Sequence, residues 1–481
     1  MQATQVTKQS FLDKTFKLKE NKTNIRTEVL AGTTTFMTMA YILVVNSNIL
    51  ADAGMDKGAA FTATAIGAFI GSCIMGILAN YPVALAPGMG LNAFFAYTVV
   101  LSMGYSWQFA LCAVFIEGII FILMSVTNVR EKILDCIPNV LKDSITAGIG
   151  LFIAFVGLAN CGLVTNGATI LQLGNLQDPL VLLTIFGLIA ISILLAKNVK
   201  GAFLIGMLIV SAVGMAIGLV EVPNAVVSSV PSMKPVFLQA LSIPFNQIFS
   251  FDMFMVVLTF LFMDLFTTVG CLVGVASKGN MLDEDGKLPR VKQALLSDSI
   301  ATTVGALLGT STVTSYVESA AGIGEGGRTG LTAITTGFMF LLALFFAPIF
   351  TSIPTQATAP VLILVGVMMA SSLTKIDFDD FTNAIPAFLT FAMMPLAYNI
   401  ADGIIFGIIS FTILKLVTKK KEEVNIYLII LSTALICGIG NISVSLMDHK
   451  IRETIANDGE FHATFYDLNC QFKSDKLLMN H

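Results

Sequence analysis

The chain alternates long apolar runs with short polar stretches. Each run has the length of about 17–25 residues that a helix needs to cross a bilayer. The pattern predicts fourteen spans in two sets of seven. The first set is 28–48, 59–79, 82–101, 108–128, 138–159, 178–196 and 201–220. The second set is 252–276, 291–309, 310–327, 330–350, 358–374, 383–398 and 401–417.

The third span of the first set is interrupted. The stretch Tyr81–Val100 opens with Pro82 and Pro87, followed by two glycines. Proline lacks an amide donor and glycine destabilises a helix, so this part is expected to be extended. The sequence after it favours a half-helix that starts around Asn92. Taken alone, the stretch would also suit a span that is merely kinked by proline.

A second interrupted span makes the simple kink less attractive. Leu308–Gly330 begins with a hydroxyl-rich, β-branched run, Thr310–Thr314, which favours extended backbone. It continues into a short helical stretch, Val317–Ala321, with Glu318 near its start. Broken helices leave free N–H groups at membrane depth, where only protein or a watery cavity can satisfy them. Two such segments indicate a transporter site at a repeat interface.

The two interrupted spans lie seven spans apart. The helix pairs Ile189–Met207 and Phe391–Ile409 share one layout and lie seven spans apart as well. Because seven is odd, the halves must have opposite orientations in the membrane, which predicts an inverted repeat. The expected fold class is therefore an all-α polytopic membrane protein with a 7+7 inverted repeat.

Composition and charge agree with a membrane protein. Hydrophobic residues make up 55% of the chain, charged residues 12%, and the mean hydropathy is +0.83. The net charge of −4 gives no reason to expect nucleic acid as a partner. Basic residues gather in the loops after even-numbered spans, which places the N-terminus in the cytoplasm by the positive-inside rule. The seven cysteines are scattered without metal-ligand spacing, so neither metal nor cofactor is expected.

The apolar runs and the charge pattern divide the chain into successive parts. They are a cytoplasmic N-terminal lead (1–27), the first repeat (28–220), a linker (221–251), the second repeat (252–417), a basic cluster with a terminal helix (418–447), and a polar tail expected to be mobile (448–481).

A few ionisable and polar residues within the spans carry the candidate chemistry. Asp264 and Glu318 are the main candidates, since an ionisable group in a span is costly and faces the protein interior or a cavity. A carboxyl group that gains and loses a proton between access states could couple proton entry to solute movement. Glu117 suits either a functional role or a helix contact beside Gly118. Asn92 suits either a helix cap or a ligand for the solute.

The motifs Ala86–Tyr97, Thr33–Ile42, Phe115–Phe121, Phe260–Gly270 and Thr310–Gly330 resemble those of the AzgA-type purine permeases. These belong to the nucleobase–cation symporter and nucleobase–ascorbate transporter group. The resemblance covers roughly residues 15–420, whereas the tail after about residue 447 departs from the family's usual ending. It implies a core domain of spans 1–4 and 8–11, a gate domain of spans 5–7 and 12–14, and short antiparallel strands in spans three and ten.

The resemblance also implies a function and a site. It implies proton-coupled uptake of adenine, guanine or hypoxanthine across the cytoplasmic membrane, by an elevator-like movement of core against gate. Asn92, Asp264 and Glu318 match the family's functional polar positions, and the main-chain amides near Ala93 and Ser319 would flank the purine. Independently of the resemblance, the rings of Phe94 and Phe95 beside the first break are candidates to stack on a flat solute. Asp264 and Glu318 are the candidates for proton coupling.

Alternatives remain open at this stage. An anion transporter or channel of the same fold class would use the two half-helix N-termini, although the acidic pair would repel an anion. A membrane receptor without transport is the third possibility. No nucleophile–base pair points to an enzyme. The sequence leaves open the preferred purine, sodium in place of protons, and a homodimer.

Overall fold

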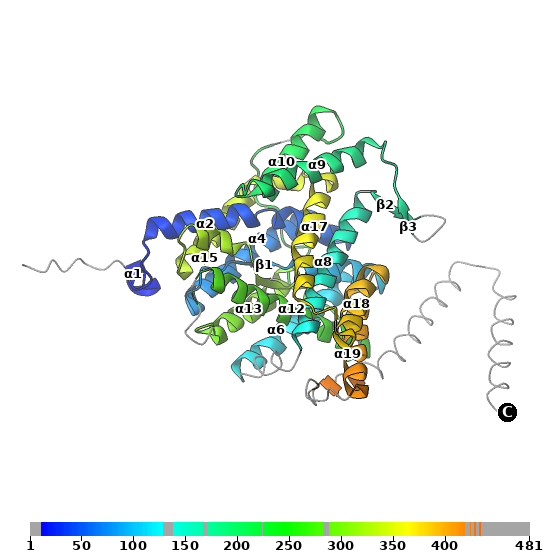
Figure 1. Ribbon diagram of the computed structural model, residues 1–481. Coiled ribbons are helices and arrows are strands. Elements are labelled where there is room, and N and C mark those ends of the chain that lie inside the picture. Colours follow the sequence, from blue (N-terminus) through cyan, green and yellow to red (C-terminus); the bar gives the residue numbers. More distant parts are fainter. Residues whose placement is uncertain are drawn as a thin grey trace, which may run out of the picture. The chain divides into compact units, whose positions relative to one another are not determined.

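The computed structural model describes residues 11–127, 138–166, 171–223, 225–279, 281, 288–418, 424, 428–429 and 432–433. Almost all of its regular structure is helical (Figure 1). The first ten residues, the basic cluster Lys419–Lys421, most of the expected terminal helix and the tail 448–481 lie outside the described residues. Residues Ile426–His481 form a separate compact unit, of which only the positions 428–429 and 432–433, all helical, are described.

Each expected span has a counterpart in the structure. In the first half these are α2 (Ile25–Met39) with α3 (Ile42–Asp52), α4 (Lys57–Ile74) with the π-helix η1 (Met75–Ala79), α5 (Met89–Ala93) with the π-helix η2 (Phe94–Ser102), α6 (Trp107–Val126), α8 (Asn139–Asn160), α9 (Pro179–Ala196) and α10 (Ala202–Ala216). In the second half they are α12 (Phe251–Lys278), α13 (Val291–Leu308), α14 (Ser319–Gly324), α15 (Gly330–Ala343) with η4 (Leu344–Phe346) and α16 (Ala347–Thr351), α17 (Thr355–Ala370) with η5 (Ser371–Lys375), α18 (Phe381–Leu396) and α19 (Ile400–Val417). Short helices outside the spans include α1 (Phe11–Phe16), η3 (Gln239–Leu241) and α11 (Phe245–Ile248).

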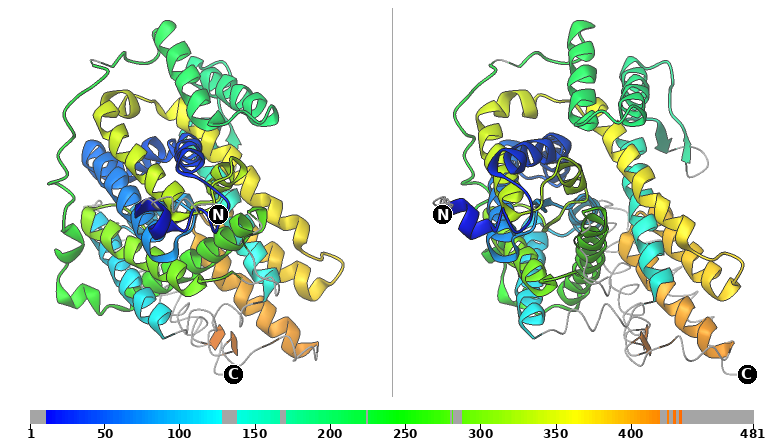
Figure 2. Two further views of the ribbon diagram at one scale, coloured as in Figure 1. Left: turned by 90° about the vertical axis from the view of Figure 1, so that its left-hand side faces the viewer. Right: turned by 60° about the vertical axis from the view of Figure 1, so that its left-hand side comes forward.

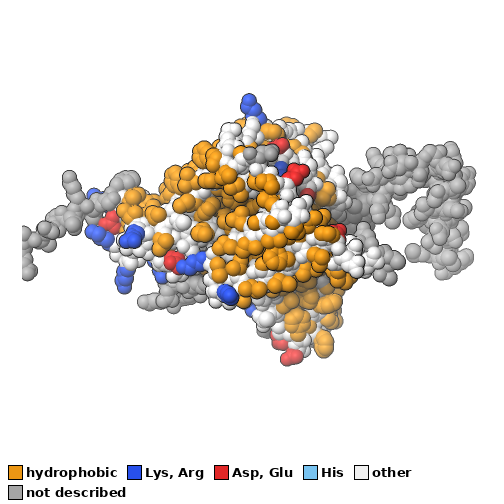
Figure 3. Space-filling view, turned by 90° about the horizontal axis from the view of Figure 1, so that it is seen from above, with side chains coloured by type: hydrophobic (Ala, Val, Ile, Leu, Met, Phe, Trp, Pro, Cys, Tyr) orange, Lys and Arg blue, Asp and Glu red, His pale blue; other side chains and the backbone are white. Residues whose placement is uncertain are grey.

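Many of these helices can cross a membrane. Within the described ranges, nine are long and apolar enough, and Met89–Ser102, α10 and α18 are shorter apolar helices. Hydrophobic side chains cover most of the face seen in Figure 3, and charged ones lie mainly towards its edges. The helix α13 is polar, yet Asp298, Ser299 and Thr302 on it are buried, so its polar groups face protein rather than lipid. The count of fourteen crossings stays a prediction.

Both interrupted spans are broken by short strands. The strands β1 (Leu85–Pro87) and β4 (Val313–Ser315) pair antiparallel, with Ala86 opposite Thr314. The amide of Gly88 donates to the carbonyl of Thr312 at 3.0 Å and extends the ladder. This confirms the expected pair of strands and excludes a simple proline kink in the first span.

The first half-helix begins earlier than expected. It starts at Met89, with Gly88 as its extended N-cap, and not around Asn92. The difference arises because a helix tolerates a glycine in its first turn. One glycine there lowers the stability of the helix by only about 1 kcal/mol. Gly90 also has a packing role, since a Cβ at this position would lie 2.6 Å from Cγ2 of Ile149 on α8. A bulkier residue would keep the two helices apart.

The helices pack in two groups (Figure 2). In one group α13 packs on α6 and α4, α15 packs on α2 and α4, and α12 packs on α6. In the other, α17 packs on α8 and α9, and α18 packs on α8 and α19. The groups correspond to the expected core and gate domains, and these names are used below.

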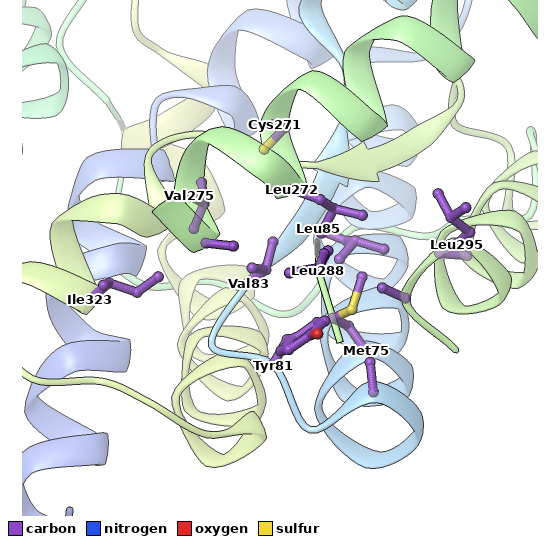
Figure 4. Close-up of a cluster of buried hydrophobic side chains, with 14 of the residues drawn as sticks. Met75, Tyr81, Val83, Leu85, Cys271, Leu272, Val275, Leu288, Leu295 and Ile323 are labelled. Atoms are coloured by element: carbon purple, nitrogen blue, oxygen red, sulfur yellow. The ribbon is translucent and has the colours of Figure 1, made fainter. Parts of the chain in front are cut away.

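A buried apolar cluster holds the first interrupted span in the core domain. Tyr81, Val83 and Leu85, which lead into and form β1, pack against Leu272 and Val275 of α12 (Figure 4). Ile323 of α14 belongs to the same cluster. Residues more than 200 positions apart in the chain thus form one core beneath the paired strands.

A second pair of strands was not expected from the sequence. The strands β2 (Val164–Asn166) and β3 (Leu171–Leu173) pair antiparallel within the connection between α8 and α9. The residues between them lie outside the described part of the chain.

Candidate functional site

Glu318 lies where the second interrupted span turns into its half-helix. It is the residue immediately before α14 and its main chain has helical angles, whereas the sequence predicted a helical stretch, Val317–Ala321, that begins ahead of it. The phenol of Tyr41 donates a hydrogen bond to its Oε1 at 2.7 Å. The side chain is only half-buried. A carboxylate fixed on one side and partly accessible on the other can accept N–H donors from a small solute.

Asp264 lies on α12 and is fully buried. The hydroxyl of Thr268, one turn further on, is 3.0 Å from Oδ1 of Asp264. The same hydroxyl is 2.9 Å from Oδ2 of Asp298 and 2.6 Å from the hydroxyl of Thr314. Asp264 is therefore joined to β4 through a single side chain, and a second buried carboxyl group shares that contact.

The hydrogen count around Thr268 has a chemical consequence. A threonine hydroxyl carries one hydrogen and can accept two hydrogen bonds. It cannot donate to Asp264 and Asp298 at the same time. The arrangement is fully satisfied when one of the two carboxyl groups holds a proton and donates to Thr268, while the other accepts from it.

Asn92 belongs to a polar network that touches both interrupted spans, which are called the first crossover (Tyr81–Val100) and the second crossover (Leu308–Gly330) below. Its amide nitrogen donates to Oδ1 of Asn46 at 2.9 Å. Asn46 in turn donates to the hydroxyls of Thr64 at 2.7 Å and Thr310 at 3.0 Å. Asn92 is fully buried, and its Oδ1 has no hydrogen-bond partner among the described residues. The side chain does not cap a helix, because α5 begins three residues earlier.

The remaining candidates, Phe94, Ala93 and Ser319, lie in packed surroundings. The buried ring of Phe94 makes an edge-to-face contact with Phe260 of α12, with ring centroids 4.8 Å apart. Ala93 is the last residue of α5. Its amide therefore lies beyond the first helical turn, and only the N–H groups of that first turn lack intrahelical partners. The hydroxyl of Ser319 accepts from the amide of Ala84 at 3.0 Å. Ser319 thereby ties the first crossover to α14.

Glu117 is fully buried on α6 and accepts a hydrogen bond from the hydroxyl of Thr312 at 3.0 Å. The adjacent Gly118 lies against α13, where a Cβ would come within 2.8 Å of the amide nitrogen of Thr303. The helix contact considered from the sequence is thus present. The carboxyl group itself contacts the second crossover.

These placements share one feature. Asn92 reaches the second interrupted span through Asn46, Asp264 reaches it through Thr268, and Glu117 contacts it directly, while Glu318 is part of it. Sequence reasoning did not select Asp298, Thr268, Tyr41 or Asn46. Asp298 had a signal, since it is an acid within a predicted span. The other three residues are recognisable only from their partners.

Comparisons with known proteins place the chain in a family. Residues 26–406 match the model of the Permease family, Xan_ur_permease. The chain belongs to this family. It is a permease, a membrane transport protein and not an enzyme.

Relatives match over most of the chain. The guanine/hypoxanthine permease PbuG of Bacillus subtilis is 49% identical over 420 residues, which cover 85% of this chain and 95% of PbuG. The adenine permease AdeP of Escherichia coli is 43% identical over 437 residues, which cover 91% of this chain and 97% of AdeP.

Solved structures show the same fold at low identity. The transmembrane domain of the cyanobacterial bicarbonate transporter BicA has a TM-score of 0.59 and 14% identity, and covers 80% of this chain and 97% of its own length. This likeness supports the fold class alone. It carries no information about the substrate.

Proposed function

We propose that this permease takes up purine nucleobases together with protons across the cytoplasmic membrane. The names of relatives at 43–49% identity, a guanine/hypoxanthine permease and an adenine permease, support the substrate class. The observation that carries the proposal is the position of Glu318, a half-buried carboxylate at the start of a half-helix. A neutral heterocycle with N–H donors suits such an acceptor.

Two further side chains complete the proposed site. The Oδ1 of Asn92 is a buried acceptor with no partner among the described residues, and a purine N–H or a bridging water would satisfy it. The buried ring of Phe94, two residues further along the same span, packs on Phe260 of the helix that carries Asp264. In this proposal Glu318 and Asn92 bind the purine.

Asp264 is the proposed proton carrier. The shared contact of Asp264 and Asp298 with Thr268 favours one proton on the pair. Thr268 also contacts Thr314 on β4, four residues before Glu318. A change of protonation at Asp264 would therefore alter the hydrogen bonds of the strand that leads to the binding carboxylate. Movement of the core domain against the gate domain would carry both groups between the two sides.

The proposed orientation has the N-terminus in the cytoplasm. The alternative of anion transport would use the N-termini of the two half-helices, α5 and α14. The acids around the second crossover oppose it, because they disfavour an anion in a poorly solvated site.

The test is uptake of labelled hypoxanthine, guanine and adenine into cells that lack their own purine permeases. Glu318→Gln and Asp264→Asn are each expected to reduce uptake to less than a tenth, with unchanged amounts of protein in the membrane. Glu221→Gln and Asp379→Asn are matched controls on exposed acids and should leave uptake unchanged. Full uptake in both site variants would contradict the proposal.

Coupling is tested with purified protein in liposomes. An acidic exterior should drive purine accumulation without sodium, and a protonophore should abolish it. Accumulation that requires a sodium gradient would overturn proton coupling. Sulfate or bicarbonate flux that purines do not inhibit would favour the anion alternative.

A further inference from the structure

We propose that Tyr41 positions the Glu318 carboxylate and links its orientation to the gate domain through Phe203. This inference rests on the proposed role of Glu318 in binding. Tyr41 lies at the junction of α2 and α3, where the first span changes from one helix to the next. Its side chain is 1% exposed, and its hydroxyl donates to Oε1 of Glu318 at 2.7 Å.

The main chain around Glu318 is already held by the same span. A Cβ on Gly322, on the next turn of α14, would lie 2.6 Å from the carbonyl oxygen of Ala31 on α2. The two helices therefore touch through their backbones. The position of α14 is set by this contact, whereas the direction of the Glu318 side chain depends on a partner for its carboxylate. Tyr41 supplies that partner from the span that also fixes the backbone.

The ring of Tyr41 faces the gate domain. It makes an edge-to-face contact with Phe203, with ring centroids 5.1 Å apart. Phe203 is 5% exposed and is the second residue of α10. One side chain thus touches the proposed binding carboxylate with its hydroxyl and a gate helix with its ring.

A second contact joins the start of α10 to the other end of α14. Lys200, just before α10, forms an ion pair with Glu325, the residue that follows α14. The beginning of this gate helix therefore reaches both ends of the half-helix, through Tyr41 at Glu318 and directly at Glu325. Movement of α10 away from the core domain would release the ion pair and leave the Tyr41 ring without its aromatic neighbour.

The two contacts of Tyr41, with Glu318 and with Phe203, can be tested separately. Its hydroxyl acts on binding, so Tyr41→Phe should raise KM for purine uptake about tenfold, as expected for a lost hydrogen bond to a charged group, with Vmax changed less than twofold. The ring contact acts on movement, so Phe203→Leu should lower Vmax several-fold and leave KM within twofold.

Tyr97→Phe is the matched control. Tyr97 is 3% exposed, and its hydroxyl donates to Oδ2 of the exposed Asp52 at 2.8 Å and accepts from Nδ2 of Asn160 at 2.9 Å, so the same atom is removed from another buried tyrosine that bonds to a carboxylate. KM should stay within twofold in this variant, although it loses two hydrogen bonds and its melting temperature in detergent should fall at least as far as that of Tyr41→Phe. A purely structural Tyr41 would lower stability without a selective rise in KM.

The outcomes are distinguishable from failure of the proposed function. An unchanged KM in Tyr41→Phe, while Glu318→Gln abolishes uptake, overturns the role of Tyr41 and leaves the binding site intact. Full uptake in Glu318→Gln overturns the proposed site itself. An equal rise in KM for Tyr41→Phe and Tyr97→Phe would also overturn the inference. If Tyr41→Phe does not accumulate in the membrane, Tyr41→Met serves instead, because methionine fills buried space without an O–H or N–H donor. The same rise in KM is then expected, together with a fall in Vmax from the lost ring contact.

Discussion

The two crossovers share a backbone plan but are held in place by different interactions. Each consists of a three-residue strand followed by a short helix, and the strands pair with each other. The first is mostly apolar and packs by shape, with Leu85 in an apolar cluster and Gly90 against α8. The second begins with a run of buried hydroxyls from Thr310 to Ser315 that bond to side chains on several helices.

The difference in composition between the two crossovers follows from the side chains that each one contacts. Hydroxyl groups can donate and accept, so the second crossover satisfies the buried carboxyl groups of Glu117 and Asp298 where water is scarce. The apolar first crossover has no such capacity and instead provides a close-packed wall. The two repeats thus share one architecture, while buried acids from both halves, Glu117 from the first and Asp298 from the second, contact the second crossover.

The largest expected effect comes from filling the backbone contact of the second crossover. In Gly322→Ala the new Cβ would lie 2.6 Å from the carbonyl oxygen of Ala31, and a backbone atom cannot turn away as a side chain can. Overpacking of this kind costs about 1–3 kcal/mol or more, and α14 would be displaced together with Glu318. Uptake should fall below a tenth, measured at equal amounts of protein.

Gly324→Ala is the control on the same helix. Gly324 has open space at the Cβ position and lies two residues further on. Because alanine favours helix more than glycine does, stability and uptake should be unchanged or slightly improved. Equal losses in both variants would show that α14 needs glycine for reasons other than its contact with α2.

A smaller effect is expected from the network that touches both crossovers. Asn46→Leu keeps the volume but removes the hydrogen bonds to Asn92 and Thr310. Each buried polar group left unsatisfied costs roughly 1–3 kcal/mol, so the melting temperature of the purified protein should fall and uptake should decrease several-fold.

Ser47→Ala tests whether this effect belongs to the network. Ser47 is equally buried, and its hydroxyl donates to the carbonyl of Leu43 one turn back in the same helix. Its loss should change the melting temperature little. A drop as large as that of Asn46→Leu would mean that polar side chains on α3 matter for the helix itself and not for joining the crossovers.

Much of the fold was predictable because membrane spans carry strong local signals. Apolar runs defined the helices to within a few residues, and Pro87 together with the hydroxyl run after Leu308 defined the two interruptions. The start of α5 was misplaced, because the destabilising effect of Gly90 on a helix was considered without its packing contact with Ile149 on α8. The pairing of β2 with β3 was missed although the sequence Asn166-Gly167 is typical of hairpin turns, because each strand has only three residues.

The site was predictable only in part. Glu318 and Asp264 were evident because acids within apolar runs are rare. The roles of Tyr41 and Thr268 could not be inferred, because an ordinary tyrosine or threonine becomes informative only when its partner is known. Those partners, Glu318 and Asp298, lie 277 and 30 positions away in the chain.

The smallest expected effect concerns the first crossover and its gate contact. In Gly90→Ala the added Cβ would lie 2.6 Å from Cγ2 of Ile149, a side-chain atom that can move. The cost should therefore be below that of Gly322→Ala, with a two- to fivefold slower uptake expected because the core and gate domains meet at this point. Ile149→Ala alone should alter uptake little, and the double variant should recover most of the lost rate. Failure of Ile149→Ala to restore uptake would show that Gly90 serves the first crossover internally, and the contrast between a shape-packed wall and a hydrogen-bonded partner would then lose its main support.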